Sequence, residues 1–451
     1  MQSFEIDKTD LLRIKTALEG EDAELEIVLK EYHASEIAML FEKLPQEAKE
    51  RIINILPTDI ASEVISEMSE EQSPGELLIN LHPEKRSEIV EELDYDDATD
   101  IISQLDEEDQ QEILEDIDED DAHSIRALLK YDEDTAGGLM NSEIIKVNIN
   151  LNKKEALDEI IRQSEEMEEF YTIYVVNNED ILQGILSIKS IIKASPQARV
   201  KDLVNSDFVY VKAELDQEDV AGLISQYNLT TIPVVDDNMK LLGRITVDDI
   251  MDVMEQESTE DILKISGVSE DEELSGNWKD AVKSRLPWLV INLGTAYLAA
   301  AVIRHFDSTV SQLPTIAAYM TIIAGMGGNA ATQALAVTVR RISLSDLTDS
   351  QAYNTVLKEF LVGMLNGAAN GLIVFFIAWF YDANPLLGLV LFLAMTGNLI
   401  VAGLTGATIP LVLKRVGIDP AVASSIIITT FTDCAGFLLP LWFATKLLLH
   451  H

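Results

Sequence analysis

The chain contains little cysteine, little histidine and little positive charge. Its 451 residues include one cysteine and six histidines, and 33 Lys and Arg stand against 78 Asp and Glu, which gives a formal net charge of -45. A single cysteine, Cys434, excludes an intramolecular disulfide and a cysteine metal cluster. Such a negative surface repels the phosphate backbone of nucleic acid, so we expect divalent metal ions, and no nucleic acid, as partners.

The negative charge is confined to one part of the chain. Residues 1–275 hold 70 acids and 23 bases, whereas residues 276–451 hold 8 acids and 10 bases. This split predicts an acidic soluble half joined to an apolar half. The N-terminus is polar and acidic, so it does not indicate a cleaved signal peptide.

The apolar half contains five long uncharged runs. Each is long enough to cross roughly 30 Å of hydrocarbon, and none has a polar face of the kind that a soluble core helix shows to water. Eight flanking bases lie on one side of the runs and two on the other, which predicts a multi-pass protein of the cytoplasmic (inner) membrane with its N-terminus in the cytoplasm and its C-terminus outside. The runs are 286–303, 308–339, 360–381, 383–413 and 420–445.

One acid, Asp433, interrupts the last run near its middle. An ionised carboxylate at this depth costs at least about 2.5 to 3.5 kcal/mol, and no Lys, Arg or His lies inside any of the five runs to compensate it. Its partner is therefore water, a proton or a transported cation; a protonated Asp433 that bridges two helices is the structural alternative. A twofold dimer with its axis at the conducting path would bring two Asp433 carboxylates together and favour a divalent ion.

The second run carries three glycines and an asparagine in the sequence GMGGN. Gly325, Gly327 and Gly328 weaken a helix, and a broken helix at membrane depth normally lines a cavity. Asn329 adds a side-chain oxygen that a hydrated cation accepts. This segment is either a pore-lining break in the helix or a notch for close helix packing.

Two internal repeats organise the acidic half. Between Leu44 and Leu129, apolar residues recur every twelve positions with one extra residue, and a turn or helix N-cap residue follows most of them, which predicts short stacked helices in a superhelix. Farther on, TIYVVNNEDILQGILSIKSII from Thr172 aligns with TIPVVDDNMKLLGRITVDDIM from Thr231 at a constant offset of 59 residues. This second repeat predicts two copies of one small α/β unit, each with two strands and a helix start.

The two copies look like a pair of CBS domains, and the whole chain resembles the MgtE family of magnesium channels. The motifs that carry this resemblance are DEDTAGGLM, the paired TIYVVNN and TIPVVDD units, ITVDDIMDVMEQESTEDI, RLPWL, GMGGN and TDCAGF. The resemblance covers essentially all residues. It implies a multi-domain fold with an all-α superhelical N-terminal domain (1–131), a tandem CBS α/β pair (132–198 and 199–257), a long connecting, or plug, helix (258–284) and a transmembrane domain of five helices (285–451).

The resemblance also implies a homodimer with a shared central pore, in which Asp433 faces the ion, and from its side-chain oxygen we expect Asn329 to be a second pore ligand. Magnesium is then the imported ion and, in the cytosol, also a regulator, because there it bridges acids that repel one another across domain interfaces and closes the pore. The acids expected to hold regulatory magnesium are Asp94, Asp96, Asp97, Asp100, Asp248, Asp249, Asp252, Glu257, Glu260, Asp261 and Asp419. The alternative for each single acid is a solvated surface residue.

Some CBS pairs bind adenine nucleotides through a Gly-x-x-Thr-x-x-Asp pattern. The second copy keeps it as Gly243, Thr246 and Asp249, whose hydroxyl and carboxylate suit ribose hydroxyls. The first copy has Ser190 where the pattern requires Asp. We therefore expect at most one complete site, with ATP as its ligand.

Three other functions compete with a magnesium channel. An importer or exporter of another divalent metal, such as cobalt or manganese, fits the same residues. A nucleotide-sensing CBS membrane receptor that passes no ion does not explain Asp433. An intramembrane metalloprotease needs His-Glu-x-x-His to bind zinc, and the sequence has no such motif. We therefore expect that the protein is not an enzyme.

Overall fold

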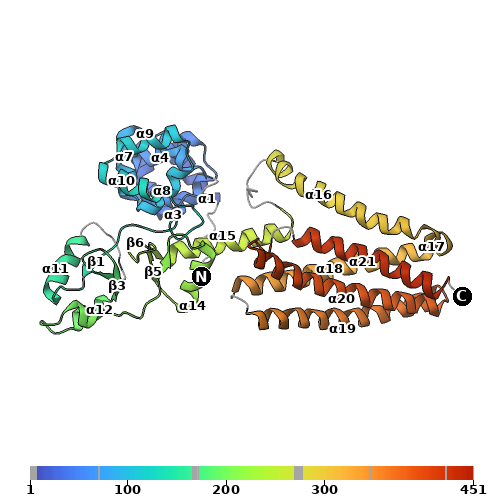
Figure 1. Cartoon of the computed structure of the whole chain (residues 1–451). Coiled ribbons are helices and arrows are strands. Elements are labelled where there is room, and N and C mark those ends of the chain that lie inside the picture. The colour runs from blue at the N-terminus through green and yellow to red at the C-terminus, as the bar shows by residue number, and fades with distance from the viewer. Residues whose placement is uncertain are drawn as a thin grey trace. The chain divides into compact units, whose positions relative to one another are not determined.

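The computed structural model describes residues 8–69, 72–164, 170, 172–268, 278–344, 348–421 and 424–449. The chain forms two compact units, Met1–Met254 and Glu255–His451. The first contains a helical N-terminal domain and the two CBS copies, and the second contains the apolar helices (Figure 1). This arrangement confirms the predicted fold class.

The N-terminal domain consists of short helices, as the twelve-residue repeat predicts. Its repeat positions lie at helix ends, where Leu44, Leu56, Leu81 and Leu93 are buried in one core. The side chain of Asp106 caps the helix that follows it by accepting a hydrogen bond from Asp109 N. The helices are α1 Lys8–Leu18, α2 Asp22–Leu29, α3 Ala34–Phe41, α4 Gln46–Ile55, α5 Thr58–Ser66, α6 Pro74–Ile79, α7 Pro83–Glu92, α8 Tyr95–Ser103, α9 Glu107–Asp116 and α10 Glu119–Leu128.

The two CBS copies have the same small sheet. Each has three strands, in the orders β1-β2-β3 and β4-β5-β6, with a parallel pair followed by an antiparallel pair. The strand register repeats with the 59-residue offset, since Tyr174 pairs with Ile185 and Pro233 pairs with Arg244. The elements are β1 Lys146–Asn148, α11 Lys153–Gln163, β2 Ile173–Val176, β3 Leu182–Leu186, α12 Ile188–Lys193, α13 Val200–Leu203, β4 Val211–Lys212, α14 Gln217–Tyr227, β5 Thr231–Val235 and β6 Leu241–Thr246.

The copies meet through one face of each sheet. Side chains alternate along a strand, so Ile173 and Val175 lie in the core of the first copy while their neighbours point away from it. Tyr174, Val176 and Leu182 of the first copy form a buried cluster with Val235 and Leu241 of the second. We call this surface the inter-copy face.

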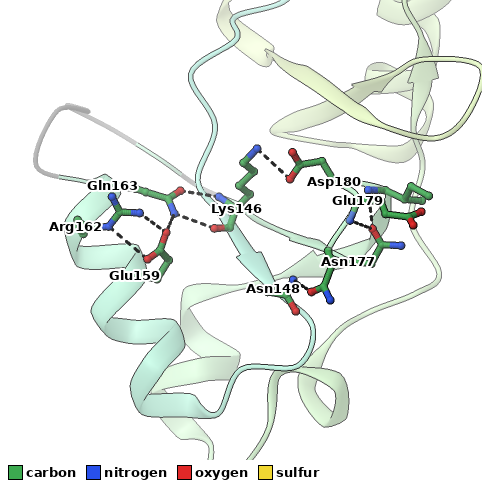
Figure 2. Close-up of polar contacts among 10 residues, drawn as sticks. Lys146, Asn148, Glu159, Arg162, Gln163, Asn177, Glu179 and Asp180 are labelled. Carbon is green, nitrogen blue, oxygen red and sulfur yellow. Dashed lines mark hydrogen bonds and ion pairs between the residues drawn. The ribbon is translucent and has the colours of Figure 1, made fainter.

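A glutamine side chain covers the outer edge of the first sheet (Figure 2). The Gln163 Oε1 accepts a hydrogen bond from Lys146 N at 2.9 Å, and Gln163 Nε2 donates to Lys146 O at 3.0 Å. These two bonds imitate the pairing of a neighbouring strand. Glu159 holds the Gln163 amide from one turn earlier on α11, at 2.6 Å.

The connecting helix begins earlier than the residue range expected for it. α15 runs without a break over Val247–Ile265, so its first turns continue directly from β6 of the second copy. The next helix, α16, begins at Trp278, and residues 269–277 of the expected range 258–284 lie outside the described residues. The division between the two compact units falls inside α15.

Among the described residues, five helices are long and apolar enough to cross a membrane, and all five lie in the second unit. In Figure 1, α18 to α21 run side by side. The first span is the most exposed of the five, since 6% of its most apolar segment is buried, compared with 56% for α20. The helices are α16 Trp278–His305, the short α17 Asp307–Gln312, α18 Thr315–Leu344, α19 Asp349–Tyr381, α20 Pro385–Val416 and α21 Ser424–Leu447.

Glycines on α19 allow it to lie directly against α20. A Cβ added at Gly363 would lie 2.4 Å from the carbonyl oxygen of Leu399, and one at Gly367 would lie 2.8 Å from the Cα of Thr396. Both neighbours are backbone atoms, which cannot move aside as a flexible side chain can. The four-residue glycine spacing therefore serves close helix packing, as in other membrane bundles.

Candidate functional site

The GMGGN segment does not break its helix. α18 continues through Thr315–Leu344, so the break that the three glycines predict is absent. The reason is a tertiary contact, since Asn398 of α20 is fully buried against this turn and its Nδ2 donates to Ile323 O at 2.8 Å. A Cβ at Gly327 would lie 2.2 Å from that Nδ2. Gly327 therefore makes room for Asn398, and the packing compensates for the low helix propensity of glycine.

The other glycines of the segment face open space. A Cβ added at Gly325 or Gly328 would meet no heavy atom within 4 Å. Asn329, one turn after Gly325, has an exposed side chain. These three residues form a polar, uncovered stripe on a helix that otherwise belongs to an apolar bundle. We call it the α18 stripe.

Asp433 lies on α21, within the last span. Its side chain is partly exposed, and it forms no hydrogen bond or ion pair with another residue in the described part of the chain. One turn later, a Cβ at Gly436 would lie 2.8 Å from the Cα of Ala324, so α21 touches α18 directly beside the glycine segment. The two pore candidates, Asp433 and Asn329, therefore come from neighbouring helices.

In the first unit, α8 brings predicted regulatory acids toward the start of α15. Asp96 is buried, and this burial together with the charges of Asp249 and Asp97 holds its pKa well above the usual range. Burial, with the charges of Asp94 and Asp249, raises the pKa of Asp97 to about 7. Burial also raises the pKa of Asp249, although its bonds from Thr246 oppose the shift. These carboxylates repel one another in the absence of a cation.

A further acid, Glu67, adds to the repulsion at Asp97, and no motif in the sequence identified it. Four of the predicted acids, Asp94, Asp100, Asp248 and Asp252, are exposed. Among the described residues, no group of three or more His, Cys, Asp or Glu side chains lies close enough together to hold a metal ion. The carboxylate oxygens of the predicted acids are nevertheless the ligands that magnesium prefers.

In the second unit, the end of α15 contacts the ends of the spans through a lysine that sequence reasoning missed. Lys264 Nζ pairs with Asp419 Oδ2 at 2.9 Å and also with Glu260, one turn earlier on the same helix. Ser343 of α18 donates to Asp261 Oδ2 at 3.3 Å, and burial raises the pKa of Asp261. Two of the acids predicted to hold magnesium therefore have an ammonium group between them. The i, i+4 spacing of Glu260 and Lys264 was the available sequence signal.

Glu257, another of the acids predicted to hold regulatory magnesium, lies on α15 one turn before Asp261, and its side chain is partly buried.

The predicted nucleotide residues lie where β6 joins α15. Asp249 Oδ2 accepts hydrogen bonds from Thr246 N at 3.0 Å and from Thr246 Oγ1 at 2.5 Å, so this carboxylate caps the start of the helix. Gly243 lies against Asn141, whose carbonyl oxygen would be 2.6 Å from a Cβ at that position. Strand packing alone therefore explains this glycine, whereas Thr246 and Asp249 keep the pattern of a ribose contact.

Comparison with protein-family models gives a match in each part of the chain. The model of a divalent cation transporter matches residues 320–443, the model of the MgtE intracellular N domain matches residues 32–134, and the CBS domain model matches residues 136–197 and 200–256.

Two curated relatives carry the same name, magnesium transporter MgtE. The protein of Thermus thermophilus is 34% identical over 435 residues, which are 95% of this chain and 96% of the relative. The protein of Enterococcus faecalis is 36% identical over 318 residues, which are 70% of each chain.

Among solved structures, the cytosolic domain of the Mg2+ channel MgtE in complex with ATP is similar to this chain. It is 37% identical with a TM-score of 0.51, and the match covers 54% of this chain and 99% of that domain. The soluble part of a magnesium transporter matches with 25% identity and a TM-score of 0.50, covering 56% of this chain and 99% of that structure. Because three family models and near full-length relatives agree over the helical domain, the CBS pair and the spans, this chain belongs to the MgtE family of magnesium transporters.

Proposed function

We propose that this protein is a magnesium-selective channel that imports Mg2+ across the cytoplasmic membrane as a homodimer. The observation that carries the proposal is the position of Asp433, a carboxylate within a span that has no hydrogen-bond or ion-pair partner among the described residues. A second copy placed against the α18 stripe would cover that stripe and bring two Asp433 carboxylates to one path. A divalent cation between them would remove the cost of placing the charges in the membrane.

The side chains present suit a hydrated magnesium ion. Magnesium keeps several of its waters, so the carboxylate of Asp433 and the amide of Asn329 would bind the ion through its hydration shell rather than strip it. Binding of this kind is loose enough to permit escape, which conduction requires. Cobalt and manganese have the same charge and are the competing ions.

Metal flux through the purified full-length protein in liposomes tests this proposal. We expect Mg2+ to enter down its gradient without ATP, and to enter faster than Ca2+, Mn2+ or Co2+ at equal concentration. Faster flux of cobalt or manganese would favour the alternative transport function, and no flux of any divalent ion would favour the CBS receptor. Empty liposomes and a Ca2+ ionophore give the lower and upper limits of the signal.

We further propose that cytosolic magnesium closes the channel by binding among the predicted regulatory acids. On the first unit the repulsion among Asp96, Asp97 and Asp249 supports this, because a divalent ion that neutralises them would stabilise the contact of α8 with the start of α15. On the second unit Asp261 and Asp419 play the same part, together with Glu257 and Glu260 of α15. An ATP molecule at Thr246 and Asp249 would compete with this neutralisation, since it brings additional negative charge.

The raised pKa values predict how stability depends on pH and magnesium. A carboxylate whose pKa rises from near 4 in the unfolded chain to about 7, as for Asp97, binds more protons when folded, so stability falls as pH rises through that interval. Without divalent ions, we expect the first unfolding transition of the full-length protein to be about 5 °C lower at pH 8 than at pH 5. Millimolar Mg2+ should remove most of this difference.

The control is the triple substitution of Asp96, Asp97 and Asp249 to Asn, measured by the same thermal unfolding. It should flatten the pH dependence and abolish the magnesium effect, whereas KCl of equal ionic strength should restore little in the original chain. If the triple variant responds to magnesium as the original chain does, the regulatory ions bind elsewhere.

A further inference from the structure

Asn398, on α20, is a buried amide within a span, and one of its two polar ends is unsatisfied. Its side chain is fully buried, and its Nδ2 donates a hydrogen bond to Ile323 O of α18 at 2.8 Å. Its Oδ1 is also buried, and it has no hydrogen-bond partner in the described part of the chain. An unpaired acceptor away from water costs free energy. A leucine of similar size would fill the same place without that cost, so packing alone does not explain the amide.

The amide lies against a turn of α18 at which three spans meet. Ile323, which provides the acceptor, and Gly327 are one turn apart, and a Cβ added at Gly327 would overlap the Asn398 amide. Beside this turn, a Cβ at Gly436 of α21 would lie 2.8 Å from the Cα of Ala324. The backbone of α18 therefore lies directly against both α20 and α21, so a small rotation of α18 would produce a clash or open a gap.

The α18 stripe lies on the side of the helix away from this contact. Successive residues of an α-helix are about 100° apart, so Gly325 and Asn329, each two positions from Gly327, point about 160° away from it. The contact between Gly327 and Asn398 therefore decides which way Asn329 faces. Asp433 lies one turn before the α21 glycine that touches α18, so it is close in depth to the same turn.

Other hydrogen bonds hold α18 near its two ends, and both go to α19 or the residue that follows it. Tyr319 donates to Asp382 Oδ2 at 2.6 Å, and Arg341 Nη1 donates to Thr355 Oγ1 at 2.9 Å. Asn398 adds a link between these two, at the depth of the candidate pore residues. Because a hydrogen bond is directional, it fixes the rotation of one helix against another, which an apolar contact does not. A buried polar residue can fix helix register in this way at a cost in stability.

We infer that Asn398 is a positioning residue for ion selectivity in the proposed channel. It contacts no ion itself; it holds α18 so that the Asn329 amide faces the same path as the Asp433 carboxylate. A ligand set that binds magnesium through its waters discriminates against calcium by the spacing of its oxygens, because calcium is larger and accepts more varied coordination. This inference deepens the proposed function and rests on it.

Flux of Mg2+ and Ca2+ through the full-length protein in liposomes tests the inference, with the ratio of the two fluxes as the readout. Loss of folded protein lowers both fluxes equally, so a merely structural role would leave the ratio unchanged. Asn398→Leu keeps the size of the side chain and removes both polar ends, and we expect it to lower the Mg2+ to Ca2+ ratio about fivefold. The matched control is Asn370→Leu on α19, whose Nδ2 donates to Asn366 O of its own helix at 2.9 Å. It should keep the original ratio.

A double variant shows whether Asn398 acts through Asn329. Asn329→Ala alone should lower the ratio by a similar factor, and adding Asn398→Leu to it should produce no further change. Gly327→Ala provides a second route, because the added methyl group displaces the amide while leaving Asn398 in the chain. It should lower the ratio as Asn398→Leu does, and it keeps the test available if the leucine variant does not fold.

The possible failures are distinguishable. If Asn329→Ala lowers the ratio but Asn398→Leu and Gly327→Ala do not, the positioning role of Asn398 is overturned and the pore ligand stands. An additional loss in the double variant would likewise overturn it, because Asn398 would then act independently of Asn329. If Asn329→Ala itself leaves the ratio unchanged, Asn329 is not a pore ligand and the inference is lost with it, whereas the channel proposal is still decided by the flux of the original chain.

Discussion

Replacing Asp433 with Ala is expected to reduce magnesium flux through reconstituted protein at least about 100-fold, because the transported ion then loses its charged ligand within the membrane. The structure supports this expectation through two features of Asp433. Its carboxylate lies in a span, and no described side chain pairs with it. A magnesium-starved host that depends on this protein should likewise stop growing.

Two further variants separate a pore role from a structural one. Asp433→Asn keeps the shape of the side chain and its capacity to bridge helices but removes the charge, so it should fail as completely as Asp433→Ala. Asp307→Asn removes a carboxylate from α17, outside the spans, and should retain full flux. If Asp433→Asn conducts normally, the side chain is a neutral hydrogen-bonding bridge between helices and the proposed pore site is lost.

Replacing Lys264 with Met is expected to raise the cytosolic magnesium concentration that half-closes the channel by about tenfold. The ammonium group lies between Glu260 and Asp419, with only 13% of its side chain exposed, so it already supplies part of the positive charge that closure requires. Without it, the two carboxylates repel, and additional magnesium must replace the lost charge. Removing one partner of a partly buried pair costs more than removing one partner of an exposed pair, which contributes about 0 to 1 kcal/mol, because the remaining buried charge is left uncompensated.

Inhibition of flux by magnesium on the cytosolic side provides the measurement. Arg415→Met is the matched control, because Arg415 pairs with Asp349 in an exposed ion pair in the same unit, with 74% and 87% of the two side chains exposed. It should leave the inhibition curve unchanged. The double variant Lys264→Met with Asp419→Asn should recover part of the original sensitivity, because it removes the repulsion as well. An unaltered curve for Lys264→Met would show that this contact does not take part in closing.

The periodic features of the molecule were predictable from the sequence because each depends on local spacing. Leu44 and Leu56 recur at the twelve-residue interval that sets the helix length, and Tyr174 and Pro233 occupy equivalent strand positions at one constant offset. The uncharged runs likewise identified the spans, although the beginning of the second run, at Ser308, belongs to the short helix α17.

The features that sequence reasoning missed depend on contacts between distant residues. The glycines of GMGGN predict a weakened helix, but Asn398, some seventy residues later, packs on Gly327 and keeps α18 continuous. From the sequence alone, Lys264 is expected to be an exposed base, because its pairing with Asp419 depends on a contact between distant residues.

The Gln163 side chain that covers β1 affects whether neighbouring copies in one membrane can pair through this strand. β1 is the outer strand of its sheet, and an outer strand with open N–H and C=O groups can recruit a strand from another molecule. Gln163 occupies both groups of Lys146, so a foreign strand would first have to displace a side chain that Glu159 holds in place. Neighbouring copies can therefore accumulate at high density without pairing strand to strand at the β1 edge of this sheet.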